Sequence, residues 1–156
     1  MNVDWMLDAV RSLRDRPSKA EWAMIQALAA STRGECTRRR VGAVVIDRRG
    51  RLAGAGYNGS EPGGPSCLKG ECPRALSGVL PGSSYDTGPG ACEAVHAELN
   101  AVLDVSDANR LEGARLFVTA EPCDGCLKIL RTKPLREIVY LDETGVTWSL
   151  SYPFRR

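Results

Sequence analysis

Apolar and polar residues recur along the first part of the chain with the period of helices. Residues 3–14 have the spacing of a short amphipathic helix, and Ser18 with Glu21 forms a capping box that opens a second helix, for which Gly34 is a stop. One face of the second helix carries large apolar side chains and is predicted to pack on the core. This face consists of Trp22, Ile25, Leu28 and Ala29.

The following segments have the composition of strands and turns. Residues 41–47 are rich in β-branched side chains and predict a buried strand, and residues 52–57 predict its antiparallel partner across a turn at 48–50. Residues 54–90 then hold ten of the sixteen glycines and five of the nine prolines. A connection of this length is functional or is held in place by something, and we treat residues 59–92 as one long loop.

Helices and strands alternate after residue 90. The predicted ranges are a helix at 95–106, a strand at 115–120, a helix at 123–131, a strand at 136–141 and an edge strand at 146–150. This alternation implies parallel pairing of the later strands. The predicted fold is therefore α/β, with helices on both faces of a mixed five-stranded sheet that begins with an antiparallel hairpin and continues with parallel strands.

Length and composition are those of one globular domain. The 156 residues suffice for a single core, which we place at residues 18–150 of a domain spanning 1–156. No apolar run approaches the roughly 20 residues that span a bilayer, and the N-terminal residues lack the pattern of a secretory signal. We therefore expect a cytoplasmic protein with no membrane partner, in which the six cysteines are metal ligands more readily than disulfides.

The charge is nearly balanced, with a formal net charge of +2. The field of the whole molecule therefore argues neither for nor against a nucleic-acid partner. Arginines cluster at 38–40 and again at 48, 49 and 51. These clusters are either a solvated surface beside the predicted strand pair or a rim that binds phosphate.

Two short motifs hold the side chains that carry chemistry. His96, the single histidine, stands two positions before Glu98, and Cys123 and Cys126 follow Pro122 in a C-x-x-C motif. Both motifs are predicted at helix N-termini, where partial positive charge stabilises thiolates. Zinc binds imidazole and thiolate, and a catalytic zinc keeps one position for water. This pattern is typical of the zinc-dependent base deaminases.

In that interpretation His96, Cys123 and Cys126 hold a catalytic zinc, and Glu98 is the proton shuttle. Zinc lowers the pKa of its water to roughly 7, so hydroxide is available at neutral pH. Glu98 then carries a proton to the ring nitrogen and to the leaving ammonia. The alternative is a structural zinc knuckle that uses a further cysteine, in a non-enzymatic interaction module, and it leaves Glu98 without a purpose.

With these motifs in place, the chain resembles the deoxycytidylate (dCMP) deaminase family of the cytidine-deaminase-like superfamily. The resemblance covers residues 36–140 and rests on four motifs, at 36–45, 56–59, 95–102 and 122–126. It implies a three-layer α/β/α fold and hydrolytic deamination of dCMP to dUMP, with hydroxide attacking C4. It also implies that Asn58, between Tyr57 and Gly59, contacts the sugar of the substrate, and that the glycine-rich turn lies close to the phosphate.

The same resemblance suggests a second metal site. Some phage and bacterial members of the family carry a structural zinc besides the catalytic one, and Cys36, Cys67 and Cys92 match its ligands by motif position, with Cys72 in the same loop. One hypothesis is therefore a four-cysteine zinc site that clamps the long loop to the core. The other hypothesis is buried or free thiols with no metal.

The substrate is less narrowly defined than the chemistry. Glu121 before Pro122 is more typical of tRNA-adenosine and guanine deaminases, so a nucleoside, a free base or a tRNA adenosine are alternatives to dCMP. Tight tRNA binding is expected to need a broader basic face, which makes a nucleic-acid partner the weaker prediction. The resemblance implies a homo-oligomer, a dimer or a hexamer. Effector binding of dCTP and dTTP occurs in parts of the family, and no residue here carries that property over.

Overall fold

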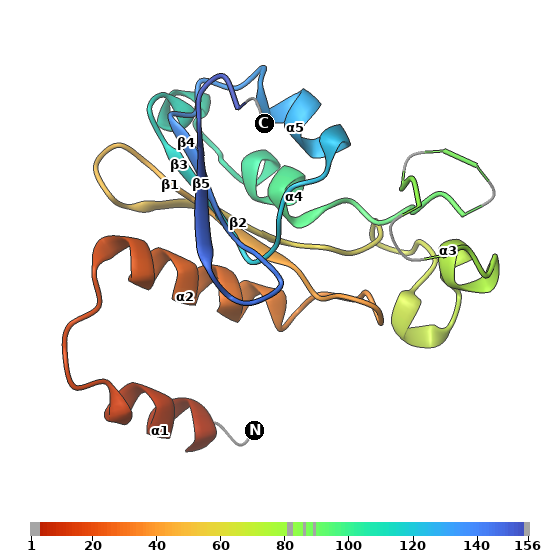
Figure 1. Cartoon of the computed structure of the whole chain (residues 1–156), viewed down its shortest axis with the longest axis horizontal. Coiled ribbons are helices and arrows are strands. Elements are labelled where there is room, and N and C mark those ends of the chain that lie inside the picture. The colour runs from red at the N-terminus through yellow and green to blue at the C-terminus, as the bar shows by residue number, and fades with distance from the viewer. Residues whose placement is uncertain (1–3, 81–82, 86, 89, 155–156) are drawn as a thin grey trace.

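The centre of the molecule is a five-stranded mixed sheet. In the computed structural model, which describes residues 4–80, 83–85, 87–88 and 90–154, the strand order is β2–β1–β3–β4–β5. The strands are β1 (Gly42–Ile46), β2 (Leu52–Tyr57), β3 (Arg115–Val118), β4 (Glu137–Leu141) and β5 (Thr147–Ser151). Helix α2 (Lys19–Ser31) covers one face, and α4 (Ala97–Leu103) and α5 (Asp124–Leu130) cover the other (Figure 1). The predicted three-layer α/β/α arrangement is confirmed.

Strand pairing differs from the prediction at the last strand. β1 is antiparallel to both β2 and β3, and β3 is parallel to β4 across α5. β5 is antiparallel to β4, although the sequence predicts parallel later strands. The reason is the short connection at 142–146, in which the Asp142 carboxylate accepts hydrogen bonds from the backbone N–H groups of Thr144 and Val146. A parallel crossover needs a dozen or more residues, so this turn can only return the chain antiparallel.

Strand β1 connects the two cores of the molecule. Ala43 and Val45 belong to the core beneath α4 and α5, whereas Val44 and Ile46 belong to the core beneath α2. Successive side chains of a strand point to opposite faces, so a central strand covered on both sides is apolar throughout. The predicted buried strand at 41–47 is therefore confirmed.

Helix α2 begins as predicted but presents a different face to the core. Both hydrogen bonds of the capping box form between Ser18 and Glu21. The predicted core face is wrong, because Trp22, Ile25 and Leu28 are exposed and so is Ala29. The buried residues are Ala23, Met24 and Ala27.

Small residues explain which face of α2 is buried. A Cβ atom built on Gly42 would lie 2.0 Å from the carbonyl oxygen of Ala27, so the helix backbone rests directly on β1. Such a close approach excludes the larger side chains from this interface. The fit of backbone to backbone, rather than the size of the apolar side chains, determines the orientation of the helix.

A glycine also permits the close contact between β2 and α4. A Cβ atom on Gly56 would lie 2.3 Å from the nitrogen of Ala101 and 2.5 Å from the carbonyl oxygen of Ala97. The first turn of α4 is therefore seated on the sheet. This seating determines where the N-terminus of α4 lies.

The remaining elements lie outside this sandwich. Helix α1 (Asp4–Ser12) is separated from the sheet by α2 in Figure 1, and Val3 of the predicted helix lies outside the described residues. The long loop contains only a 3₁₀ turn (Cys67–Lys69) and the short helix α3 (Pro73–Leu76), and its residues 81, 82, 86 and 89 are not described. A further 3₁₀ turn (Ala108–Leu111) precedes β3. Within the described residues, no helix is long and apolar enough to cross a membrane.

Candidate active site

The N-termini of α4 and α5 meet on the same side of the sheet. His96 is the N-cap residue of α4, and Cys123 is the N-cap residue of α5. Cys126, in the first turn of α5, donates its backbone N–H to the Cys123 sulfur at 3.5 Å. The predicted positions of the two motifs at helix starts are therefore found, although both helices are shorter than predicted.

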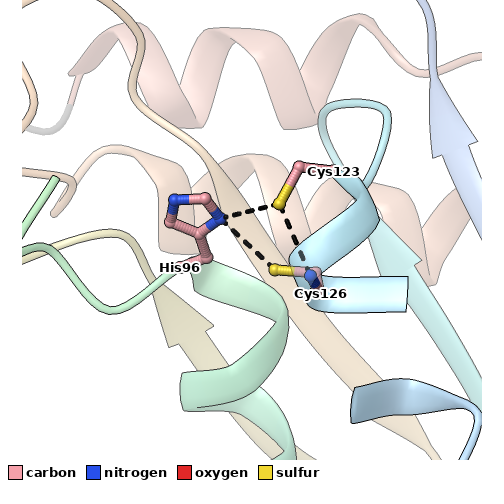
Figure 2. A group of neighbouring side chains, drawn as sticks. All are labelled: His96, Cys123 and Cys126. Carbon is pink, nitrogen blue, oxygen red and sulfur yellow. Dashed lines mark hydrogen bonds between the residues drawn. The ribbon is translucent and has the colours of Figure 1, made fainter. Parts of the chain in front are cut away.

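The side chains of these three residues converge on one point. Nδ1 of His96 lies 3.4 Å from Sγ of Cys123 and 3.3 Å from Sγ of Cys126 (Figure 2). Zn–S bonds of 2.3 Å and Zn–N bonds of 2.0–2.1 Å at a tetrahedral angle place nitrogen and sulfur about 3.5 Å apart. The observed spacing fits one shared zinc ion. In the described part of the chain, this is the single group of three or more histidine, cysteine or acidic side chains close enough to share an ion.

Without a metal, the three side chains form a strongly polarised cluster. A hydrogen bond from Cys126 and another from His96 outweigh burial and lower the pKa of Cys123 to about 3. Hydrogen bonds to Cys123 and Cys92 raise the pKa of His96 to about 10. The cluster therefore contains a thiolate and an imidazolium near neutral pH. A thiolate is the form of cysteine that binds metal.

Glu98 lies beside this cluster, on the first turn of α4. Its side chain is buried, with 4% of its surface exposed, and burial raises the pKa of its carboxyl. The carboxyl is in hydrogen-bond contact with Cys126 and lines the same cavity as His96 and Cys123. A raised pKa moves this carboxyl toward the pH range in which a side chain both accepts and donates protons.

The cavity has a volume of about 140 Å³ and contains most of the predicted site residues. Asn58 lines it, and its side-chain amide is held by hydrogen bonds from the N–H of Val41 and to the carbonyl of Arg39. Tyr57 and Gly59 are not among the lining residues. Gly59 instead pairs with Val95 in an isolated β-bridge, which anchors the segment that leads into His96. The substrate roles of these residues stay predictions.

The four remaining cysteines lie around the same cavity without forming a ligand set. Cys36, Cys67, Cys72 and Cys92 all line it. Although all four belong to the described residues, no three of their sulfur atoms lie within 4.8 Å of one another. Cys67 and Cys72 share a hydrogen bond. Burial, and after it the interaction with Cys72, raises the pKa of Cys67 to about 12. The second zinc therefore stays a prediction.

Two side chains of the cavity have no counterpart in the sequence motifs. The guanidinium carbon of Arg74 lies 4.3 Å from the ring centroid of Tyr85, and the ring of Tyr85 meets that of His96 edge-on at 5.5 Å. Both lie in the long loop and come to the site through tertiary contacts. The one feature of the sequence that distinguishes Arg74 is that it is the single arginine between Arg51 and Arg110.

Comparisons with known proteins agree with this site. Residues 17–142 match the cytidine and deoxycytidylate deaminase zinc-binding region. The chain is 44% identical over 130 residues to the deoxycytidylate deaminase of Mycobacterium phage D29. The aligned residues make up 83% of this chain and 98% of the phage protein. It is 35% identical over 133 residues, 85% of this chain, to the deoxycytidylate deaminase of Schizosaccharomyces pombe, and spans 40% of that longer protein.

A solved structure extends the likeness to three dimensions. The dCMP deaminase of the cyanophage S-TIM5, in complex with dCMP and dUMP, is 26% identical and superposes with a TM-score of 0.60 over 83% of this chain and 85% of that chain. The matching residues 17–142 include the zinc-ligand motifs and the buried glutamate. The chain therefore belongs to the deoxycytidylate deaminase family of zinc-binding hydrolases.

Proposed function

We propose that this protein converts dCMP to dUMP and ammonia by zinc-dependent hydrolysis. The observation that carries the proposal is the convergence of His96, Cys123 and Cys126 beside the buried carboxyl of Glu98 in one cavity. The names of the phage and yeast relatives support the substrate, and the cyanophage complex contains both the proposed substrate and the proposed product.

In this mechanism the chain divides the chemistry between a metal-binding cluster and one acid. When bound, zinc supplies Lewis-acid activation of water. His96, Cys123 and Cys126 would hold the ion at the N-termini of α4 and α5. The Glu98 carboxylate would take a proton from the attacking water and give it to N3 of the cytosine ring. It would then take the second proton from the new hydroxyl group at C4 and pass it to the amine, which leaves as ammonia while the C4 carbonyl forms. Burial of Glu98 favours this exchange because it brings the pKa of the carboxyl toward the working pH.

The substrate is placed by groups on the cavity wall. We propose that Asn58 contacts the sugar, as the resemblance implies. Its amide is oriented by Val41 and Arg39, and the oxygen and the NH₂ group each keep one further position for a hydrogen bond. We also propose that Tyr57 and Gly59, which flank Asn58, contact the substrate, although neither lines the cavity.

A substrate panel tests the proposal. Ammonia release is measured with zinc-loaded protein on dCMP, cytidine, guanine and a tRNA anticodon stem-loop, with Glu98→Gln as the matched inactive control. We expect the highest kcat/KM on dCMP. Turnover of another member of the panel without turnover of dCMP would contradict the substrate. No turnover of any member would favour the interaction module.

We also propose a second zinc held by Cys36, Cys67, Cys72 and Cys92. The four line one cavity, and Cys67 and Cys72 are already in contact. For all four sulfur atoms to bind one ion, the long loop must contract around it. Cys92 must also give up its hydrogen bond with His96. We expect two zinc ions per chain, and one in Cys67→Ser. One zinc per chain in both proteins would end the hypothesis.

A homo-oligomer is proposed from the outer face of α2. Trp22, Ile25 and Leu28 are exposed there with 36%, 41% and 46% of their surface accessible. Exposed apolar side chains that gather on one face are typical of subunit interfaces. Sedimentation equilibrium is expected to find a dimer or a hexamer that Ile25→Glu dissociates, and a monomer at micromolar concentration would contradict the proposal.

A further inference from the structure

A second pocket lies between the β1–β2 turn and the 3₁₀ turn that precedes β3. Its volume is about 340 Å³, compared with about 140 Å³ for the catalytic cavity. The lining consists of two aspartates, Asn109 and four arginines, which are Arg48, Arg49, Arg51 and Arg110. The four arginines and two aspartates leave a formal excess of two positive charges. The whole chain also has a net charge of +2, so the residues outside this pocket are balanced.

One of the two carboxylates already has a counter-ion. Oδ2 of Asp47 accepts hydrogen bonds from Nε of Arg110 at 3.1 Å and from a terminal nitrogen of Arg110 at 2.9 Å. Oδ1 of Asp47 accepts the backbone N–H groups of Arg49 and Arg51 at 3.0 and 2.9 Å. Asp47 is 8% exposed, so these bonds are largely shielded from water. The Asp47 carboxylate therefore neutralises Arg110 and holds the β1–β2 turn in shape.

The three arginines of the turn have no such partner. Arg48, Arg49 and Arg51 are exposed, and the ion pairs found among the described residues use other arginines. A further cation lies beside them, because a Cβ atom built on Gly50 would be 3.3 Å from the ammonium nitrogen of Lys19. Like charges that lie close together repel, and an anion bound between them relieves the repulsion.

The chemistry of the lining indicates which kind of anion fits. Arginine binds phosphate oxygens through charge-assisted hydrogen bonds that are often bidentate. The lining, as far as the structure describes it, contains no aromatic or aliphatic side chain on which a nucleobase could stack. The pocket is therefore suited to the charged group of a ligand, and its volume leaves room for more than one phosphate.

The pocket lies at the opposite end of β1 from the catalytic cavity. Val41, directly before β1, lines the catalytic cavity, and Asp47, directly after β1, lines this pocket. A rise of roughly 3.4 Å per residue separates the two residues by about 20 Å. The β1–β2 turn and the long loop accordingly lie at opposite ends of the molecule (Figure 1). A ligand in this pocket does not compete with the substrate.

We propose that this pocket binds a compact anion that carries two or more phosphate groups. Arg48, Arg49 and Arg51 donate hydrogen bonds to the phosphate oxygens, and Asp47 keeps the turn that carries them in shape. The phosphate groups come either from an inorganic polyphosphate or from a phosphate ester of a small organic molecule. The pocket recognises the part that the two ligands share, and it takes no part in deamination.

Isothermal titration calorimetry with pyrophosphate tests the proposal. The full zinc-loaded chain is used, with excess dUMP to fill the catalytic cavity. We expect one site per chain, whose affinity falls as the salt concentration rises, because exposed charges are screened. Arg49→Gln and Arg51→Gln are each expected to weaken binding about tenfold and to leave turnover of dCMP unchanged. No binding of pyrophosphate to the wild type overturns the proposal.

Two further variants separate a defined site from a general effect of charge. Arg14→Gln removes an equal charge from an exposed arginine outside the pocket and is expected to keep the wild-type affinity. Asp107→Asn removes a negative charge from the lining, while its side-chain oxygen still accepts the backbone N–H of Asn109. This variant is expected to bind pyrophosphate severalfold more tightly. Equal weakening in Arg14→Gln and Arg49→Gln overturns the assignment.

A pair of ligands distinguishes the two sources of the phosphate groups. Tripolyphosphate and ATP both carry three linked phosphates, and ATP adds a sugar and a base. We expect similar dissociation constants for the two, both weakened by Arg49→Gln. Binding of ATP that is tighter by more than about tenfold would show that a base is held as well. This lining has no means to hold a base, so that result overturns the assignment.

Discussion

Two cysteines from different regions of this molecule, Cys123 and Cys67, differ in their state of ionisation. At the helix N-termini, the hydrogen bonds from Cys126 and His96 lower the pKa of Cys123 to about 3. In the long loop, burial and the neighbouring Cys72 raise the pKa of Cys67 to about 12. The same side chain is therefore a thiolate in one region and a thiol in the other.

The difference comes from the partners that surround each sulfur. Cys123 faces an imidazole, which becomes a cation and stabilises the thiolate. Cys67 faces other thiols, and a second negative charge beside a first is unfavourable. Cys92, the one of the four remaining cysteines that contacts His96, has a lowered pKa as well, because the hydrogen bond with the imidazole favours its thiolate. Contact with the histidine therefore determines which sulfur ionises.

The two regions also differ in the secondary structure that holds their metal-binding side chains. His96 and Cys123 begin helices that pack on the central sheet, and α4 is in backbone contact with β2 at Gly56. Cys67 begins a 3₁₀ turn of the long loop, and Cys72 precedes a four-residue helix. The cluster of His96, Cys123 and Cys126 is therefore positioned by the core, whereas Cys67 and Cys72 are positioned by short turns of the loop.

The largest effect is expected from Glu98→Gln. This change keeps the shape of the side chain and removes its proton transfer, so turnover is expected to fall by roughly 10²–10⁴-fold while the zinc content stays unchanged. Ammonia release and metal analysis on the same sample measure both quantities. Near-normal turnover in this variant would remove Glu98 from its role.

A difference of reactivity is expected between the two cysteine groups in metal-free protein. Alkylation of Cys123 by iodoacetamide is expected to vary little between about pH 5 and pH 8, because a pKa of about 3 keeps it ionised throughout. The ion pair between the Cys123 thiolate and the His96 imidazolium is lost in two ways. It is lost as the pH rises through the His96 pKa of about 10, or as the pH falls through the Cys123 pKa of about 3. Cys67, with a pKa of about 12, is expected to stay unreacted.

Peptide mapping by mass spectrometry reads out each cysteine separately. The control is the urea-unfolded chain, in which alkylation of an ordinary cysteine rises about tenfold per pH unit below a pKa of about 8.5. A similar tenfold rise for Cys123 in the folded protein would show that the two regions do not differ as described.

The smallest effect is expected from Gly56→Ala, which tests the support of the catalytic cluster. A methyl group at this position would meet the backbone of α4, so the free energy of unfolding is expected to fall by about 1–3 kcal/mol. Ala55→Val adds methyl groups to the exposed side of the same strand and is expected to cost less than about 0.5 kcal/mol. Urea unfolding of both variants measures the difference, and equal values would contradict the close contact.

The sequence predicts the catalytic cluster well because its geometry is local. A histidine and a C-x-x-C motif at helix starts place their side chains by the conformation of single turns, and two such turns need only meet. The strand at 41–47 and the capping box at Ser18 are predicted for the same reason, since each depends on neighbours in the chain.

Features that depend on distant contacts are predicted poorly. The buried face of α2 is set by Gly42, which favours alanine over the larger Trp22 and Leu28. The direction of β5 is set by a five-residue turn that the helix–strand alternation does not reveal. Arg74 reaches the cavity through hydrogen bonds to residues 83, 84 and 90, and no spacing in the sequence marks them.

The most direct test of the account replaces one cysteine from each region and counts zinc alongside turnover. Cys123→Ala is expected to lose one zinc ion per chain relative to the wild type and to lose all measurable ammonia release from dCMP. Cys67→Ala is expected to keep the zinc at His96, Cys123 and Cys126 and to keep turnover. Full zinc content and turnover in Cys123→Ala would contradict the claim that this cluster holds the catalytic ion.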